Sequence, residues 1–297
     1  MSKKYKKIIA KVFFLVSAIV YSQSPVSGFY AKKNELSIAS GYSFKSYNKF
    51  YRGTTLSDNT PANLGKITSS IVNLYGEYGI SDWLSTVASV PYISIKSETG
   101  VDPIQNKNLV EGVQDLGVTL KAKAYEKTLK GASKLTLGAS AGINIPISDY
   151  EASGVLSIGN RATTIDFIAI AHYTSPFNVF AELQTGYSDR NSSDFEIPNA
   201  ALHIVKIGYF NDWIYVHTKL GIQNSLSGLD IGTPEFAKAG GPNALPETEV
   251  DYTSLSFDLY TPVYKKTIGL SLGFATTLNG RNFNAESGFS LSLVYKS

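Results

Sequence analysis

Large and small side chains alternate along much of the chain with a period of two. In TIGLSLGFATTL, the stretch from Thr267 to Leu278, bulky apolar residues take one set of alternating positions, and glycine, serine, alanine and threonine take most of the other. Because successive side chains of a strand point to opposite sides, this pattern predicts a strand with two chemically different faces. The first question is which of these faces points inward.

The same period predicts twelve strands and no helix beyond the first 22 residues. Short turns follow the second, fourth, sixth, eighth and tenth strands, whereas the other links are mostly longer, and the longest runs from Gln223 to Glu249. An even number of strands joined alternately by short turns and long loops is typical of an outer-membrane barrel with periplasmic turns. We therefore predict an all-β fold, a transmembrane antiparallel up-and-down β-barrel with strands at 34–46, 68–79, 83–95, 113–125, 133–145, 163–173, 178–187, 200–210, 213–222, 251–261, 267–278 and 287–296.

Charged residues are absent from the more apolar face of all twelve predicted strands, the face of Leu120, Phe167 and Leu272. A soluble barrel would carry charges on its outer face. A lipid-facing surface excludes them, because Arg or Lys there costs roughly 2–4 kcal/mol at the bilayer midplane. The apolar face therefore points outward into lipid. The candidate lumen-lining residues are Asp115, Lys121, Lys123, Asp166, Glu182, Lys206, Lys219 and Asp258.

Aromatic residues gather at the short-turn ends of the predicted strands. Amphipathic rings favour the headgroup region, where outer-membrane barrels carry aromatic girdles. The predicted girdle consists of Tyr78, Trp83, Tyr125, Tyr173, Phe177, Tyr209, Trp213, Tyr260, Tyr264 and Tyr295.

The N-terminus has the layout of a secretory signal peptide. Four lysines precede an apolar stretch from Ile8 to Val20, and small residues suit cleavage after Ser22. The apolar stretch is short for a membrane span, although an uncleaved anchor is the alternative. We expect a signal peptide at 1–22, a single barrel domain at 23–297, and a location in the outer membrane of a Gram-negative bacterium.

Removal of that leader changes the charge balance. Five of the 27 basic residues lie in it and none of the 24 acidic ones do, which leaves 22 basic and 24 acidic residues. A mature chain of formal charge −2 gives no compositional support for nucleic-acid binding. The chain has no cysteine, and its three histidines are scattered without metal-binding spacing, so we predict no metal, no cofactor and no catalytic residues.

Three stretches resemble a known family. NLYGEYGISDWLSTVASVPY (Asn73–Tyr92), GVQDLGVTLKAKAY (Gly112–Tyr125) and KLTLGASAGINIPISDY (Lys134–Tyr150) are similar to segments of the MetA-pathway-of-phenol-degradation family of outer-membrane barrels, which belongs with hydrophobic-compound transporters. Gln114 and Ser148 stand where that pattern has glycine. The resemblance implies an outer-membrane pore or transporter, and it does not by itself make phenols the cargo.

The first functional hypothesis is a channel or transporter that passes small molecules, hydrophobic or aromatic ones among them. The alternatives are a structural or surface-binding barrel with a blocked lumen and, less favoured, an interfacial lipid-modifying enzyme that would use an outward histidine such as His203. We predict a non-enzyme. Its expected partners are outer-membrane lipid, a small-molecule cargo of unknown identity and the outer-membrane assembly machinery.

Two roles stay open for the lumen charges. Lys121, Glu182, Lys206 and Lys219 fall near the middle of their strands, where they could form a selectivity belt or brace the wall with ion pairs. Asp115 could hold a loop or guide cargo at the mouth, or only accept backbone hydrogen bonds. The Gln223–Glu249 loop could control access to the lumen, because long loops in compact domains are usually functional or disordered; the alternative is a flexible exposed loop.

Overall fold

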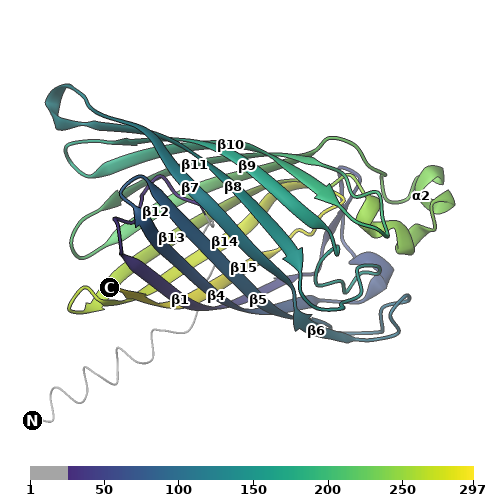
Figure 1. Ribbon diagram of the computed structural model, residues 1–297. Coiled ribbons are helices and arrows are strands. Elements are labelled where there is room, and N and C mark those ends of the chain that lie inside the picture. Colours follow the sequence, from purple (N-terminus) through teal and green to yellow (C-terminus); the bar gives the residue numbers. More distant parts are fainter. Residues whose placement is uncertain (1–25) are drawn as a thin grey trace, which may run out of the picture.

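The computed structural model describes residues 26–297, and its dominant feature is a closed antiparallel barrel of twelve strands (Figure 1). Strands pair in chain order, and pairing of the first strand with the last closes the wall. The barrel strands are β1 (Leu36–Tyr47), β4 (Ile67–Ser81), β5 (Leu84–Ser97), β7 (Asp115–Thr128), β8 (Lys134–Pro146), β9 (Thr163–Thr174), β10 (Val179–Asn191), β11 (Ala200–Phe210), β12 (Tyr215–Ser225), β13 (Asp251–Tyr264), β14 (Ile268–Arg281) and β15 (Ser287–Lys296).

Each of the twelve predicted strands corresponds to one barrel strand, which confirms the predicted fold class. The structure adds short elements that the sequence pattern did not predict. They are β2 (Phe50–Arg52), β3 (Thr55–Ser57), β6 (Leu109–Val113), the helix α2 (Pro234–Lys238) and the 3-10 turns η1 (Pro61–Asn63), η2 (Lys130–Ala132) and η3 (Gly241–Glu247).

The extra strand β6 continues the line of β7 beyond a break at Gln114. β6 pairs with residues 92–96 of β5, and β7 pairs with residues 84–89 of the same strand. At the break, the Gln114 N–H donates to the carbonyl of Pro91 at 3.0 Å. The departure from the family pattern at Gln114 therefore lies where one long strand is interrupted.

Short turns and the C-terminus lie at one end of the barrel, and the long loops with α2 lie at the other (Figure 1). The predicted leader, residues 1–22, lies outside the described residues. Within residues 26–297, no helix is long and apolar enough to span a bilayer. Below, the two ends are called the short-turn end and the long-loop end.

The outer surface of the barrel is apolar and its interior is polar. Outward side chains such as Leu120, Phe167 and Ile207 are 50% to 60% exposed, whereas inward Lys121 is 1% exposed. The exposed positions follow the alternation predicted for the lipid face, and glycines such as Gly273 line the inside of the same strands. The barrel therefore has its apolar side chains outside and its polar side chains inside, the reverse of a soluble protein.

Nine of the ten predicted girdle aromatics are exposed at the short-turn end, and Tyr260 is the exception. Its ring faces the interior, where Lys296 Nζ lies 4.4 Å from the ring centre. A bulge in β13 between Pro262 and Tyr264 changes the alternation, so that Tyr264 points outward although it shares the parity of Tyr260. Tyr260 has the inward parity of Asp258, so its assignment to the girdle was wrong because it rested on position at the strand end and not on the face of the strand.

Candidate functional site

Glu182 on β10 is the centre of a buried group of polar side chains midway along the barrel. Its carboxylate lies 2.9 Å from Lys206 Nζ and 3.0 Å from His172 Nδ1. It also accepts hydrogen bonds from the Gly28 N–H at 2.7 Å and from Gln184 Nε2 at 2.5 Å. The side chain is 1% exposed, and a carboxylate this deeply buried needs several donors to replace its lost hydration.

A second ion pair lies on another part of the wall, between side chains of β7 and β4. Lys121 Nζ on β7 lies 2.8 Å from Glu77 Oε1 on β4 and donates to the Phe29 carbonyl at 2.7 Å. Lys121 also lies 4.8 Å from the centre of the Tyr30 ring. The two pairs thus connect strands on different parts of the wall to the same N-terminal segment.

The polar side chains of these two ion pairs, Glu182, Lys206, Lys121 and Glu77, form a belt around the lumen. This belt continues onto β12 and β13. Lys219 is directly across from Lys206 in the register of β11 and β12. On β13, Asp258 accepts from Ser256 Oγ at 3.3 Å, and its Oδ2 lies 3.4 Å from His217 Nε2. Acidic and basic side chains are therefore both present around the middle of the lumen, and no single sign of charge dominates it.

Five of the eight predicted lumen-lining residues meet in this belt: Lys121, Glu182, Lys206, Lys219 and Asp258. The other three lie elsewhere. Lys123 pairs with Glu126 at 3.2 Å near the short-turn end, and Asp166 accepts from Asn144 Nδ2 at 3.0 Å toward the long-loop end. Asp115 lies at the mouth, where it accepts a hydrogen bond from the Tyr150 hydroxyl at 2.6 Å.

The N-terminal segment Val26–Tyr30, which we call the inner plug, runs through the belt. The carbonyl of Val26 accepts hydrogen bonds from Gln184 Nε2 at 3.0 Å and from Lys206 Nζ at 3.2 Å. At the other end of the plug, the Tyr30 hydroxyl donates to the carbonyl of Ala122 at 3.2 Å. Most of the belt's polar contacts to the plug go to its backbone.

Two cavities flank the inner plug and share no lining residue. A cavity of about 350 Å³ lies on the long-loop side and borders Gln184 and Lys219. A cavity of about 550 Å³ opens toward the short-turn end and borders Phe29, Lys206 and Asp258. The plug and the belt therefore lie between two open parts of the lumen.

An apolar group, which we call the mouth cluster, lies at the long-loop end. Its buried members come from inward strand positions, from the loop before β4 and from the loop between β8 and β9: Tyr47, Leu64, Ile67, Ile93, Val110, Tyr150, Leu156 and Ile158. Buried Asp102 joins two loops here by accepting from the N–H groups of Ile104 and Leu156, each at 2.8 Å. Tyr150 is fixed by Asp115, so that Asp115 holds a loop through a side-chain contact.

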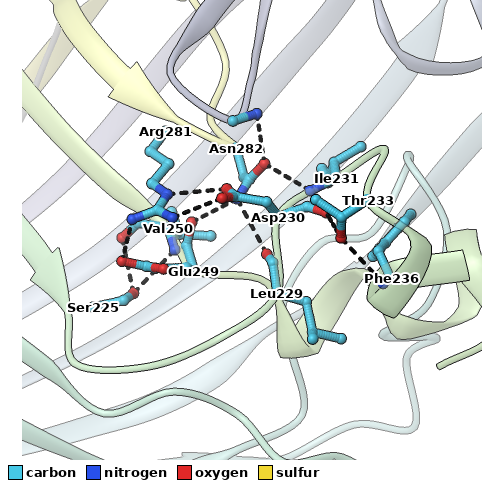
Figure 2. Close-up of polar contacts among 11 residues, drawn as sticks. Ser225, Leu229, Asp230, Ile231, Thr233, Phe236, Glu249, Val250, Arg281 and Asn282 are labelled. Atoms are coloured by element: carbon cyan, nitrogen blue, oxygen red, sulfur yellow. Dashed lines mark hydrogen bonds and ion pairs between the residues drawn. The ribbon is translucent and has the colours of Figure 1, made fainter. Parts of the chain in front are cut away.

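The long loop between β12 and β13 is fastened to the end of β14 (Figure 2). Arg281 binds both carboxylate oxygens of Asp230, at 2.9 and 2.6 Å, and also contacts Glu249. Next to it, Asn282 donates to the carbonyls of Leu229 and Glu249 at 3.2 and 2.8 Å. Such bidentate pairing fixes orientation as well as distance.

The pKa values of the two loop carboxylates, Asp230 and Glu249, shift in opposite directions. The hydrogen bond from Arg281 lowers the pKa of Asp230 below its ordinary value. Burial instead raises the pKa of Glu249, although the same guanidinium favours its charged form. The apolar residue Phe236 of α2 is buried, and α2 lies beyond the long-loop end of the barrel (Figure 1).

The sequence pattern missed the inner plug and the aromatic residues that contact it. Val26–Tyr30 shows no strand period, and its partners lie 92 to 180 residues away in the chain. Phe180, Phe210 and Tyr215 gave a signal that could have been used. They are bulky rings at inward positions of strands whose other inward residues are mostly small or polar.

Residues 74–218 match the model of the family described as Putative MetA-pathway of phenol degradation. Among solved structures, the chain is similar to the COG4313 outer membrane channel from Pseudomonas putida F1. That likeness has a TM-score of 0.73 at 14% identity and covers 93% of this chain and 100% of the other. The closed barrel and its apolar exterior support the predicted location in the outer membrane of a Gram-negative bacterium.

Two weaker likenesses are to the translocator domain of the autotransporter NalP from Neisseria meningitidis and to the NanC porin. The first has a TM-score of 0.49 at 8% identity and covers 99% of this chain and 95% of the other. The second has a TM-score of 0.46 at 10% identity and covers 88% and 100%. No curated protein matches the chain significantly.

Proposed function

Because this chain belongs to the outer-membrane barrel family described as Putative MetA-pathway of phenol degradation, we propose that it is a channel for small molecules, with hydrophobic and aromatic ones among its cargo. The observation that carries the proposal is the pair of lumen cavities, about 350 and 550 Å³, on either side of the inner plug and the belt. A lumen that is wide on both sides of a short peptide segment is suited to passage once that segment moves.

The lining of the lumen supports the breadth of the cargo. The belt carries three lysines, Lys121, Lys206 and Lys219, against Glu77, Glu182 and Asp258, so it does not select one sign of charge. The mouth cluster is apolar, and the wall residues around Phe29 of the inner plug are aromatic. These surfaces favour uncharged and apolar solutes over salts.

Conductance in a planar bilayer is the direct test. The purified protein is expected to give discrete steps, and liposomes that contain it are expected to take up small neutral aromatics faster than empty liposomes. Val216→Leu, a change beside Tyr215 that faces lipid, is the matched control and is expected to conduct as the unaltered protein does. A folded protein that shows no conductance or flux, both with the inner plug in place and with it displaced, would contradict the channel.

A blocked structural barrel is the second candidate, and one observation favours it. The inner plug and the mouth cluster narrow the lumen at two levels. A channel is expected to conduct better once the plug is displaced, whereas a structural barrel stays silent with the plug in place or removed. Conductance of plug variants therefore separates the two functions.

The enzyme alternative has little support in the site. His203, the outward histidine, lies 3.0 Å from the Thr185 hydroxyl. Within residues 26–297, no group of His, Cys, Asp and Glu side chains is arranged to hold a metal ion. Hydrolysis of phospholipid by the purified protein, lost in His203→Ala, would favour the enzyme.

We also propose that the barrel is inserted by the outer-membrane assembly machinery.

A further inference from the structure

Four aromatic rings of the barrel wall surround the side chain of Phe29 in the inner plug. The Phe29 ring centre lies 4.5 Å from His172 and 5.2 Å from Phe180. It lies 5.3 Å from Phe210 and 5.7 Å from Tyr215. All four contacts are edge-on, with interplanar angles between 69° and 86°. This is the arrangement that aromatic rings prefer over face-to-face stacking.

The four rings, which we call the Phe29 cage, are held in place without help from Phe29. Phe180 stacks between His172 and Tyr215, with ring centres 5.4 and 5.5 Å apart. His172 is fixed further by contacts of 3.0 Å to Glu182 and 3.1 Å to the Thr174 hydroxyl. Since the cage residues stand on four paired strands, the site is preformed.

The occupant of the cage, in contrast, is a tethered segment. The plug is held at Val26, Gly28 and Phe29 by hydrogen bonds to its backbone, which do not depend on side-chain identity. Phe29 is only half-buried and borders the short-turn cavity, so the cage can be reached from that cavity once the ring leaves. Phe29 therefore occupies the cage as an intramolecular ligand would.

Gly28 shows how closely the plug must approach the wall. A Cβ at this position would lie 2.4 Å from His172 Cβ and 2.5 Å from His172 Cγ. Since His172 is buried and fixed on both ring nitrogens, it has no room to move away. A side chain at position 28 is thus expected to expel the plug while leaving every cage residue unchanged.

We propose that the Phe29 cage is a binding subsite for a small uncharged monocyclic aromatic molecule, and that Phe29 is its built-in competitor. This inference rests on the proposed channel function and names the part of the lumen that recognises cargo. The cage suits an uncharged ring because Glu182, the carboxylate nearest to it, is already bound by donors. A tethered ring competes at an effective concentration on the order of millimolar, so the cage is masked until the plug moves.

The test uses 4-fluorobenzyl alcohol as the probe and the full barrel in lipid nanodiscs, with binding measured by fluorine NMR line broadening. Phe29→Ala vacates the cage, Gly28→Val expels the plug, and Phe29→Ala combined with Phe180→Ala removes part of the cage. Phe283→Ala is the matched control, because Phe283 also stacks on an inward ring, Tyr252 at 4.5 Å, but borders the other cavity. Heat-modifiable migration on gels confirms that each variant is folded.

The probe is expected to bind Phe29→Ala and Gly28→Val about tenfold more tightly than the unaltered protein, because the tethered competitor is gone. The gain is expected to vanish in the double variant and to be absent in Phe283→Ala. Equal binding to the unaltered protein and to both single variants would overturn the subsite. So would a gain that survives loss of Phe180, or displacement of the probe by cyclohexylmethanol as readily as by benzyl alcohol.

Binding and transport fail separately in this design. Probe binding to the cage in a barrel that never conducts would contradict the proposed channel function and support the subsite. Conductance without cage-dependent binding would support the channel function and contradict the subsite.

Discussion

The mouth cluster and the inner plug, which narrow the lumen and are called its closures below, are built in different ways. At the long-loop end, loops fold into a compact structure whose apolar members pack together and whose charges pair side chain to side chain, as Arg281 does with Asp230. Toward the short-turn end, five residues lie in the lumen and are held mainly through their backbone. One closure is part of the folded protein, whereas the other resembles a bound peptide.

This difference bears on which closure opens. Moving the mouth cluster would expose buried apolar side chains such as Leu156 and break the contacts of buried Asp102. Moving the inner plug exchanges a few backbone hydrogen bonds for contacts with water and leaves the wall intact. We therefore expect the plug to be the closure that moves during passage and the mouth to act as a fixed filter.

Both closures need an intact barrel wall, so the largest effect is expected from a substitution that prevents the wall from assembling. Leu272→Lys puts a charge on the lipid face, at a cost of roughly 2–4 kcal/mol near the bilayer midplane, and should prevent assembly. Ser271→Lys puts the same charge in the wet short-turn cavity and should be tolerated. Heat-modifiable migration of the two variants measures folding, and equal defects would show that the faces are wrongly assigned.

The next largest effect is expected at the inner plug. Gly28→Val should raise single-channel conductance several-fold, because the added side chain cannot fit beside His172. Ser27→Val is the matched control, since Ser27 borders the short-turn cavity and has more room. Unchanged conductance in a folded Gly28→Val protein would mean that the plug is no barrier, and the contrast between the two ends would lose its functional meaning.

A smaller effect is expected at the long-loop end. Deletion of Leu229–Leu245 removes α2 and most of the fastened loop but leaves the mouth cluster, whose members come from other segments. Conductance or solute flux should rise, but less than in Gly28→Val, and the barrel should stay folded. A deletion protein that conducts better than Gly28→Val would reverse the ranking of the two closures.

The smallest effect is expected from acid at the loop anchor. Because the pKa of Asp230 is lowered by Arg281, its contribution to loop stability is complete above the ordinary aspartate pKa and is lost as the pH falls through the lowered value. Glu249 partly offsets this, since its pKa is raised by burial and its protonation comes first. The chain has no cysteine, so a spin label on Asn243→Cys reports loop motion cleanly.

The label should become more mobile upon acidification. In Asp230→Asn it should already be mobile at neutral pH, with a much smaller change in acid. An acid transition that is the same in Asp230→Asn would assign the loop anchor to other groups.

The barrel could be predicted from sequence because its cause is local. A lipid-facing position excludes charge whatever its neighbours are, so alternation around residues such as Leu270 and Leu272 reveals the fold one strand at a time. Inward charges such as Glu182 and Lys206 follow from the same parity. Their pairing also depends on register, which alternation alone does not specify across strands.

The closures could not be predicted because their causes are not local. Gly28 is required by the position of His172, 144 residues further along the chain, and nothing beside Gly28 in the sequence reports that distance. Tyr150 caps its own loop only because Asp115 lies within reach across the mouth. The bulge near Pro262 likewise reverses the direction of Tyr264 relative to Tyr260 without any break in the apolar pattern.

The inner plug also has a consequence for the order in which the protein matures. Its partners stand on β7, β9, β10, β11 and β12, strands from the middle of the chain, and they converge only when the sheet has curved into a cylinder. The plug lies next to β1 in the chain, yet it has no binding site until much later strands are in place. Contacts between residues so distant in sequence form late because the intervening chain must first be ordered. The earliest described part of the chain is thus the last to find its place, and its docking reports that the barrel is complete.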